Sequence, residues 1–320
     1  MSTCPSATTT GSPRAAAAKA ANARSSSTRS NHPRGQAVDA AARPPPRTPD
    51  FVALGHVALD LTDDGWILGG TAAYAASTAR NLGRRAAVVT SAEDGLDLAA
   101  HLPDIQIEAS GAPATTTFRN TYTEEGRIQW LHSRAAPLTP ADVPGAWREA
   151  PIALLAPIAR EVSEDLADLF PRALLGISLQ GWLRRWDTAG RVTPAAWEPS
   201  ARFLARADAL ILSEQDLTGI QEPMMPILEA ARLTVLTQGD RGATLLRSGD
   251  AIQIPAPTSH EVDPTGAGDV FAAAFLIQLA QTRDPVGAVA FANRAAALSV
   301  RGPGLTAVPT REEVEGQTGF

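Results

Sequence analysis

The sequence predicts an α/β fold in which helices cover both faces of a mostly parallel central sheet. Short apolar runs rich in Val, Ile and Leu recur from about residue 49 onward, and stretches with helical spacing separate them. Several runs are apolar at every position, as expected of strands that are buried on both faces. Polar residues follow the ends of these runs, and ligands of such folds bind beyond the carboxyl ends of the strands.

The first half of this region is predicted to contain two strands, one helix and a hairpin. The run DFVALGHVALDL indicates one buried strand that ends near Asp60. Gly69 and Gly70 precede TAAYAASTARNLG, whose apolar spacing favours a helix ended by Gly83. RAAVVTS, at 85–91, is predicted to be a strand. Residues 115–132 alternate in polarity around a Glu-Glu-Gly turn, which is typical of a β-hairpin.

In the second half, strands and helices alternate, which is the pattern of a parallel sheet with crossover helices. The predicted strands are 150–157, 172–179, 209–214, 233–239 and an antiparallel pair within 242–254. The predicted helices are 161–171, 201–208, 223–231, 266–281 and 285–300.

Residues 1–48 differ in composition from the rest of the chain. They are rich in Ala, Ser, Arg, Pro and Thr, and their seven basic residues against one acidic residue give a net charge of +6. With so few large apolar side chains, this tail is expected to be disordered, whereas 49–320 is expected to form one domain. The tail is a loose extension, an upstream misassigned start or an organellar targeting segment.

Charge and rare residues exclude several classes of function. The whole chain has a net charge of −6, which leaves −12 on residues 49–320 and argues against a nucleic-acid partner. The only cysteine is Cys4 and the only lysine is Lys19, so the domain has no cysteine metal site, Schiff-base lysine or Walker-type lysine. No apolar run is long enough to span a membrane and no secretory signal pattern is present, so we expect a cytoplasmic protein.

The sequence GAGD, at 266–269, stands at the start of a long Ala-rich helix. The glycines keep Cβ atoms away, and the first amides of a helix have no intrahelical partner, so Gly266, Ala267 and Gly268 form a candidate phosphate site. Asp269 is the group in this cluster that accepts a proton. Alone, the pattern is also that of a glycine-rich turn with an acidic residue at the helix start, which is a common arrangement.

DPTGAGDVFAAAF resembles the C-terminal signature of the PfkB, or ribokinase-like, carbohydrate kinases from Asp263 through Asp269. Other segments resemble this family in the same order along the chain: VALGHVALD, the paired glycines, TQGDRGATLL and AFANRAAALSV. The resemblance implies a three-layer αβα kinase domain with a small, reduced β lid, formed mainly by the hairpin at 115–132.

The resemblance also implies roles for individual residues. It suggests Asp269 as general base, the backbone of Gly266 to Gly268 as anion hole, ATP and Mg²⁺ as cofactors and possibly K⁺. The implied ATP-binding residues are Thr237, Gly239, Gly242 and Asn293, and the candidate substrate-binding residues are Asp60, Gly69, Gly70, Arg119 and Gln180. The candidate metal ligands are Asp216 and Glu214 for Mg²⁺ and Asp263 and Thr265 for a monovalent cation.

Three departures from the family pattern bear on specificity. The family's N-x-x-E motif is replaced by Ser213 and Asp216, and the alternative role for this pair is a helix cap. Tyr74 stands where the family has an asparagine, and it either offers a hydroxyl to the ligand or packs in the helix. The third departure is the short segment between Asp60 and Gly69, which predicts a reduced lid and leaves the protein a monomer or a homodimer. On the hairpin that would supply most of this lid, Arg119 is either an anion clamp or a solvated charge.

These observations favour an ATP-dependent kinase that phosphorylates a hydroxyl of a small sugar, cyclic polyol or nucleoside. The alternative is a non-catalytic sugar- or nucleotide-binding protein on the same fold, which the altered metal motif would suit. A nicotinamide-dependent oxidoreductase is disfavoured because the first strand–helix turn lacks G-x-G-x-x-G.

Overall fold

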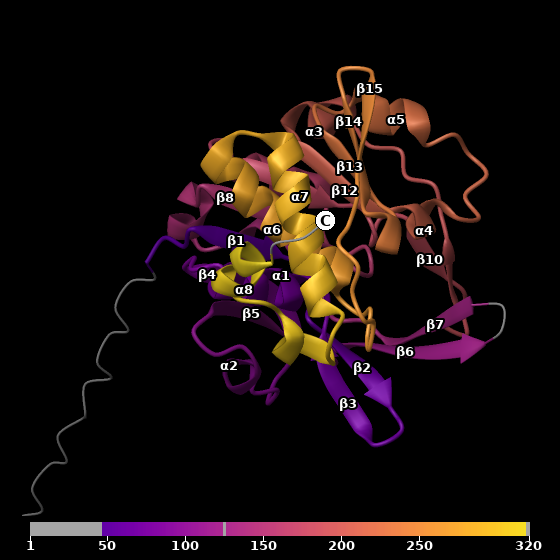
Figure 1. Cartoon of the computed structure of the whole chain (residues 1–320). Helices are drawn as coiled ribbons and strands as arrows, with labels where there is room; N and C mark the ends of the chain where they lie inside the picture. The colour runs from indigo at the N-terminus through magenta and orange to yellow at the C-terminus, as the bar shows by residue number, and fades with distance from the viewer. Residues whose placement is uncertain (1–46, 124–125, 318–320) are drawn as a thin grey trace, which may run out of the picture. The chain divides into compact units, whose positions relative to one another are not determined.

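The computed structural model describes residues 47–123 and 126–317. The chain divides into two units, 1–44 and 45–320, and the fold described below is that of the second (Figure 1). The disorder predicted for residues 1–48 therefore concerns positions that, apart from 47 and 48, lie outside the described residues. Within the described ranges, no helix combines the length and the apolar character needed to cross a bilayer.

Nine of the described strands form one sheet in the order β15-β14-β13-β12-β9-β8-β1-β4-β5. Neighbours from β13 to β5 are parallel, and only the pairings of β14 with β13 and of β14 with β15 are antiparallel. The predicted α/β class with a mostly parallel sheet is thus confirmed. The strands are β1 (Phe51–Leu54), β4 (Ala86–Glu93), β5 (Gln106–Ala112), β8 (Ile152–Leu155), β9 (Leu174–Ser178), β12 (Ala209–Ser213), β13 (Thr234–Thr237), β14 (Ala243–Arg247) and β15 (Asp250–Ile254).

Both faces of this sheet are buried, which explains why its strands are apolar at successive positions. In β1, Phe51 and Ala53 join one core cluster, and Val52 and Leu54 join the other, on the opposite face. The first cluster contains α1, α6 and α7, which pack against one another in front of the sheet in Figure 1. The described helices are α1 (Thr71–Asn81), α2 (Leu98–His101), α3 (Ala201–Arg206), α4 (Glu214–Leu217), α5 (Met225–Ala230), α6 (Ala267–Thr282), α7 (Pro285–Ser299) and α8 (Arg311–Gly316).

A second, four-stranded sheet in the order β3-β2-β6-β7 forms the lid. An antiparallel pair lies where the hairpin was predicted, although its Glu-Glu turn falls outside the described residues. The prediction of one continuous strand from 51 to 60 was wrong, because the chain leaves the main sheet after β1 and enters the lid as β2. A Cβ on Gly55 would lie 2.1 Å from the carbonyl oxygen of Ala156, so the crossing after β1 requires glycine. The lid strands are β2 (Ala58–Thr62), β3 (Gly65–Gly69), β6 (Thr116–Thr123) and β7 (Gly126–Ser133), and a small separate hairpin is formed by β10 (Arg184–Trp186) and β11 (Val192–Pro194).

A buried carboxylate joins the roots of the lid to the main sheet. Glu161 is 1% exposed and accepts hydrogen bonds from the backbone amides of His56, Ile158 and Ala159 at 2.7–3.1 Å. The imidazole of His56 in turn contacts the hydroxyl of Thr116, at the start of β6, at 2.7 Å. These contacts fix the segments that follow β1 and β8 against the beginning of the lid.

We expect Glu161→Gln to lower the free energy of unfolding by about 2–3 kcal/mol, because an NH2 donor takes the place of one of the two carboxylate oxygens that accept from backbone amides. Urea unfolding at pH 7 measures this change. Glu149→Gln, which alters an exposed pair with Arg172, serves as the control and should change stability by less than about 0.5 kcal/mol. Equal unfolding midpoints for the native protein and Glu161→Gln would contradict the expectation.

Candidate active site

The GAGD sequence forms the first turn of α6, beyond the carboxyl ends of the parallel strands. Gly266 precedes the helix in the left-handed region, with φ of 80°. Among the described residues, no hydrogen-bond partner is found for the amides of Gly266 and Gly268. The amides of Ala267 and Asp269 donate within the turn, at 3.2 and 3.0 Å. Of the four amides from Gly266 to Asp269, those of Gly266 and Gly268 are therefore available to an anion at this helix end.

Asp269 is half-buried in the same turn, and burial raises its pKa to about 7. Thr71 and the positive charge of Arg184 oppose this shift, whereas the charges of Asp216 and Asp60 add to it. The hydroxyl of Thr71 is buried and has no partner of good hydrogen-bond geometry among the described residues, so its contact with Asp269 is a loose one. A carboxylate with this pKa changes charge near neutral pH and can take up a proton there.

Tyr74 of α1 lies between the glycine pair and the start of α6. It is 3% exposed, and a Cβ on Gly266 would lie 2.3 Å from its ring. Burial raises the pKa of Tyr74, and the charges of Asp269, Asp263 and Asp60 raise it further, so the phenol stays protonated. The aromatic ring therefore packs against Gly266, and the negative charges of Asp269, Asp263 and Asp60 act on the hydroxyl.

The paired glycines are needed because Asp60 and the preceding backbone come very close. A Cβ on Gly69 would lie 2.4 Å from Oδ2 of Asp60, and one on Gly70 would lie 2.7 Å from the carbonyl oxygen of His56. Gly70 also has a φ of 91° and precedes α1 directly. The structure thus brings Asp60, both glycines and Tyr74 together beside Asp269.

The segment predicted to bind the nucleotide follows β13. Thr237 donates to the carbonyl of Leu212 at 3.3 Å, and Gly239 and Gly242 have φ of 61° and 90°. A Cβ on Gly242 would lie 2.2 Å from the carbonyl oxygen of Ile254, so this turn requires glycine. Asn293 of α7 is buried, and its amide donates to the carbonyls of Ile254 and Pro255 at 3.0 and 3.1 Å. The side-chain nitrogen of Asn293 is therefore already used in holding the segment that follows β15.

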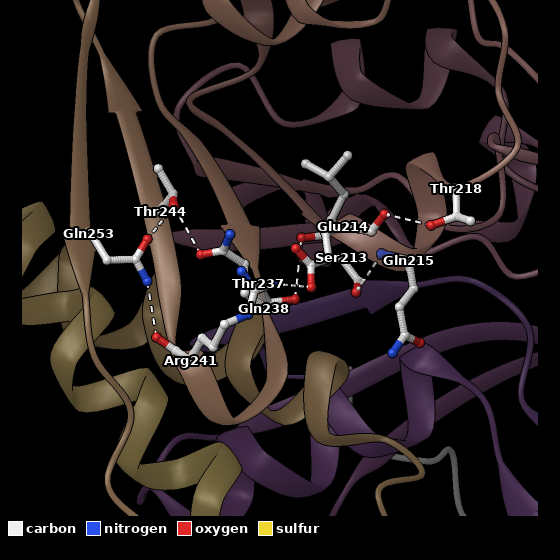
Figure 2. Close-up of polar contacts among 10 residues, drawn as sticks. Ser213, Glu214, Gln215, Thr218, Thr237, Gln238, Arg241, Thr244 and Gln253 are labelled. Atoms are coloured by element: carbon white, nitrogen blue, oxygen red, sulfur yellow. Dashed lines mark hydrogen bonds and ion pairs between the residues drawn. The ribbon is translucent and has the colours of Figure 1, made fainter. Parts of the chain in front are cut away.

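The candidate magnesium ligands differ in their contacts. Ser213 and Asp216 form a capping box on α4, in which Oδ2 of Asp216 accepts from the amide of Ser213 at 2.9 Å. The helix-cap role considered for this pair is therefore present. Glu214 forms an ion pair with Arg241, which lowers the pKa of Glu214 (Figure 2). No group of three or more His, Cys, Asp or Glu side chains suited to a metal occurs in the described part of the chain.

The candidates for a monovalent cation site form a turn at the entrance to α6. Oδ1 of Asp263 accepts from the amide of Thr265 at 2.9 Å, and Oδ2 accepts from the amide of Gly304 at 3.4 Å. Both carboxylate oxygens therefore hold backbone groups in place.

Arg119 lies apart from the other candidates. In the parallel pairing of β2 with β6, Asp60 is opposite Phe118 and Leu61 is opposite Arg119, so Arg119 and Asp60 point to opposite faces of the lid. Arg119 is exposed, whereas Phe118 is buried against Leu131 and Ile158. Gln180 is half-buried just after β9, on the same edge of the sheet as Ser213 and Thr237.

Sequence reasoning did not identify Thr71 and Glu161 as parts of the site or its support. Thr71 directly follows the paired glycines, and this position was the available signal for its proximity to Asp269. Glu161 stands in an ordinary polar segment. Two of the amides that it accepts from, those of Ile158 and Ala159, are its near neighbours in the sequence, but the amide of His56 is 105 positions away, and no local pattern reveals that contact.

Residues 199–311 match the family model of the pfkB family carbohydrate kinases. The chain is 42% identical to the ribokinase of Bacillus subtilis (strain 168) over 98 residues, which are 29% of this chain and 33% of that protein. It is 34% identical to the bifunctional protein HldE of Bradyrhizobium diazoefficiens over 122 residues, which are 38% of this chain and 24% of that protein. These matches thus span a third or less of the length of the curated relatives.

Solved structures match over most of the chain. A pyrophosphate-dependent kinase in the ribokinase family, solved as a sulfate complex, has a TM-score of 0.71 at 22% identity and covers 84% of this chain and 100% of its own. The Arabidopsis thaliana ribokinase complexed with ribose and ATP has a TM-score of 0.63 at 20% identity and covers 84% and 98%. The fold is therefore ribokinase-like, and the resemblance to the PfkB family is confirmed over residues 199–311.

Proposed function

We propose that the protein is an ATP-dependent phosphotransferase that phosphorylates a hydroxyl group of a small sugar, cyclic polyol or nucleoside. The observation that carries this proposal is the first turn of α6, where two amides without partners stand beside Asp269. The confirmed family resemblance supports the same reaction class. Asp60, with Gly69 and Gly70, borders the acceptor side, and the turn at Gly239 and Gly242 borders the donor side.

In this proposal the acceptor hydroxyl attacks the terminal phosphorus of the donor, and the bond from that phosphorus to the bridging oxygen breaks. Asp269 accepts the proton of the attacking hydroxyl, for which a pKa of about 7 is well suited. The amides of Gly266 and Gly268 donate to the oxygens of the transferring phosphoryl group, where negative charge is concentrated. The dipole of α6 adds to this stabilisation.

Magnesium would be held on the donor side by Asp216, because one of its carboxylate oxygens remains after the helix cap and its charge reaches Asp269. It would neutralise charge on the donor phosphates. Glu214 fits this role less well, because its carboxylate pairs with Arg241. We also propose that a monovalent cation binds beside Asp263 and Thr265. Such an ion would help to order the turn that these two residues form before α6.

A panel of assays identifies the phosphoryl donor and the acceptor. The structural neighbours include a pyrophosphate-dependent kinase complexed with a pyrophosphate analog and myo-inositol, so inorganic pyrophosphate and cyclitols belong in the panel. Each donor, ATP or pyrophosphate, is incubated with Mg²⁺ and each sugar, cyclitol or nucleoside, and products are detected by ³¹P NMR. We expect one acceptor class to give a phosphate monoester.

The second candidate is a non-catalytic sugar- or nucleotide-binding protein, favoured by the use of Asp216 as a helix cap. A thermal-shift screen with the same compounds separates the two, since a ligand of the folded state raises the melting temperature. Stabilisation by a donor and an acceptor without any monoester product would favour the binding protein and contradict the proposed kinase.

We expect kcat/KM for the acceptor, at saturating donor, to rise with pH through a midpoint near 7. Asp269 acts as a base only when ionised, and its pKa is raised to about 7, so activity is lost as the carboxylate becomes protonated. Below the midpoint the rate should fall about tenfold per pH unit. A profile that is flat from about pH 5.5 to 8 would show that no group with this pKa limits the reaction.

A further inference from the structure

The donor side of the site contains an ion pair between two neighbouring strand ends. Arg241 lies in the short turn after β13, and Glu214 is the first residue of α4, directly after β12. β12 and β13 are parallel, with Ser213 opposite Thr237, so both side chains arise at the same edge of the sheet. The side chains are 58% and 39% exposed, and the pair therefore lies in contact with solvent.

The backbone beneath Arg241 is held by contacts that do not involve its guanidinium (Figure 2). The side chain of Gln253 donates to the carbonyl of Arg241 at 3.0 Å, and Thr244 donates to the side chain of Gln238 at 3.0 Å. The amide of Gln238 donates to the carbonyl of Gly242 at 2.8 Å, closing the turn. Because exposed ion pairs add little to stability, the Glu214 contact is dispensable for the turn and can be exchanged for another anion.

The charges around the site call for a cation at this position. Asp60 and Asp216 act on Asp269, and a phosphoryl donor brings several further negative charges. The only lysine of the chain is Lys19, so positive charge in the domain comes from arginines. The charge of Arg184 acts on Asp269, whereas Arg241 belongs to the turn that follows β13, on the donor side. A guanidinium binds a phosphate through two parallel hydrogen bonds. A carboxylate can take the place of the phosphate as the acceptor of these bonds.

We propose that Arg241 binds the polyphosphate of the phosphoryl donor and that Glu214 holds this arginine in place while the donor is absent. This inference rests on the proposed function. Donor binding replaces the carboxylate of Glu214 by phosphate oxygens as the partner of the guanidinium, with no covalent change. The chemistry is common to the phosphate chain of ATP and to inorganic pyrophosphate. Glu214 thus competes with the donor, and the two members of the pair have opposite effects on donor affinity.

The test is isothermal titration of the full-length protein, with Mg²⁺ present, with two non-hydrolysable probes, adenylyl imidodiphosphate and imidodiphosphate. We expect Arg241→Gln to weaken binding about tenfold. Glu214→Gln should tighten binding about two- to fivefold, because the competing carboxylate is gone. The double variant should resemble Arg241→Gln. Arg172→Gln, which breaks another exposed arginine–glutamate pair, should leave both affinities unchanged.

The two probes distinguish the donor source. Weaker binding of both, or of only one, supports the inference and identifies which phosphate compound Arg241 contacts. Unchanged affinity of Arg241→Gln for both probes would overturn it, as would weaker binding by Glu214→Gln. Equal melting temperatures show that the variants are folded. Binding of the probes is measured without turnover, so the two hypotheses can fail separately. If the native protein transfers a phosphoryl group and Arg241→Gln binds both probes with native affinity, only this inference is refuted. If the native protein binds neither probe, the proposed function is refuted as well.

Discussion

Asp269→Asn is expected to lower kcat by about 10²–10⁴-fold while leaving donor binding within about threefold of native. The amide has the shape of the carboxylate but cannot accept the acceptor's proton. The substitution also removes the negative charge that burial destabilises, as the raised pKa of Asp269 shows, so the variant should be at least as stable as the native protein. Steady-state rates on the accepted substrate, calorimetric titration of the donor and a thermal melt measure these three properties.

The control for this substitution is Asp250→Asn, the same chemical change at an exposed position, the first residue of β15. Its rate should equal that of the native protein. If Asp269→Asn retained a rate within about twofold of native, the hydroxyl would lose its proton to another group and the proposed base would be abandoned. The pH dependence near 7 should disappear in the Asn variant together with the rate.

The parallel sheet could be predicted from the sequence because strands that are buried on both faces are apolar at successive positions, and this pattern is visible within each short segment. The sequence also placed Asp269, Gly266 and Gly268 at one helix start, because the helix and its glycines are adjacent in the chain. The lid was predicted less well. Whether residues after Gly55 continue in the main sheet depends on the carbonyl of Ala156, about a hundred positions away, and no local pattern records that contact.

The same limit applies to the site. Arg119 and Asp60 are both polar residues of lid strands, and only the register of β2 with β6 shows that they lie on opposite faces. Glu214 and Asp216 were both reasonable metal ligands by type and spacing. The ion pair of Glu214 with Arg241 and the cap of Asp216 on Ser213 are tertiary and local contacts that the residue types alone do not distinguish.

The geometry around Gly266 explains why a glycine is required there. Its φ of 80° is unfavourable for a residue with a Cβ, and that Cβ would lie 2.3 Å from the ring of Tyr74. Tyr74 is buried between α1 and α6 and cannot move away without disturbing their packing. A larger residue would therefore push the first turn of α6 outward, together with the amides that we propose bind the phosphoryl group.

Gly266→Ala is therefore expected to lower kcat by about 10²–10³-fold, comparable to the loss of one fixed donor to a transferring group, and to weaken the fold as well. Gly83→Ala is the matched control. Gly83 has nearly the same φ, 79°, but open space surrounds its Cβ position, and it lies beyond the C-terminal end of α1, away from Gly70 and Tyr74. The control variant should lose about 1 kcal/mol of stability and no activity. Rates and urea unfolding of both variants separate backbone strain from displacement of the amides. Equal rates in the two variants would mean that Tyr74 does not hold the phosphoryl site in place.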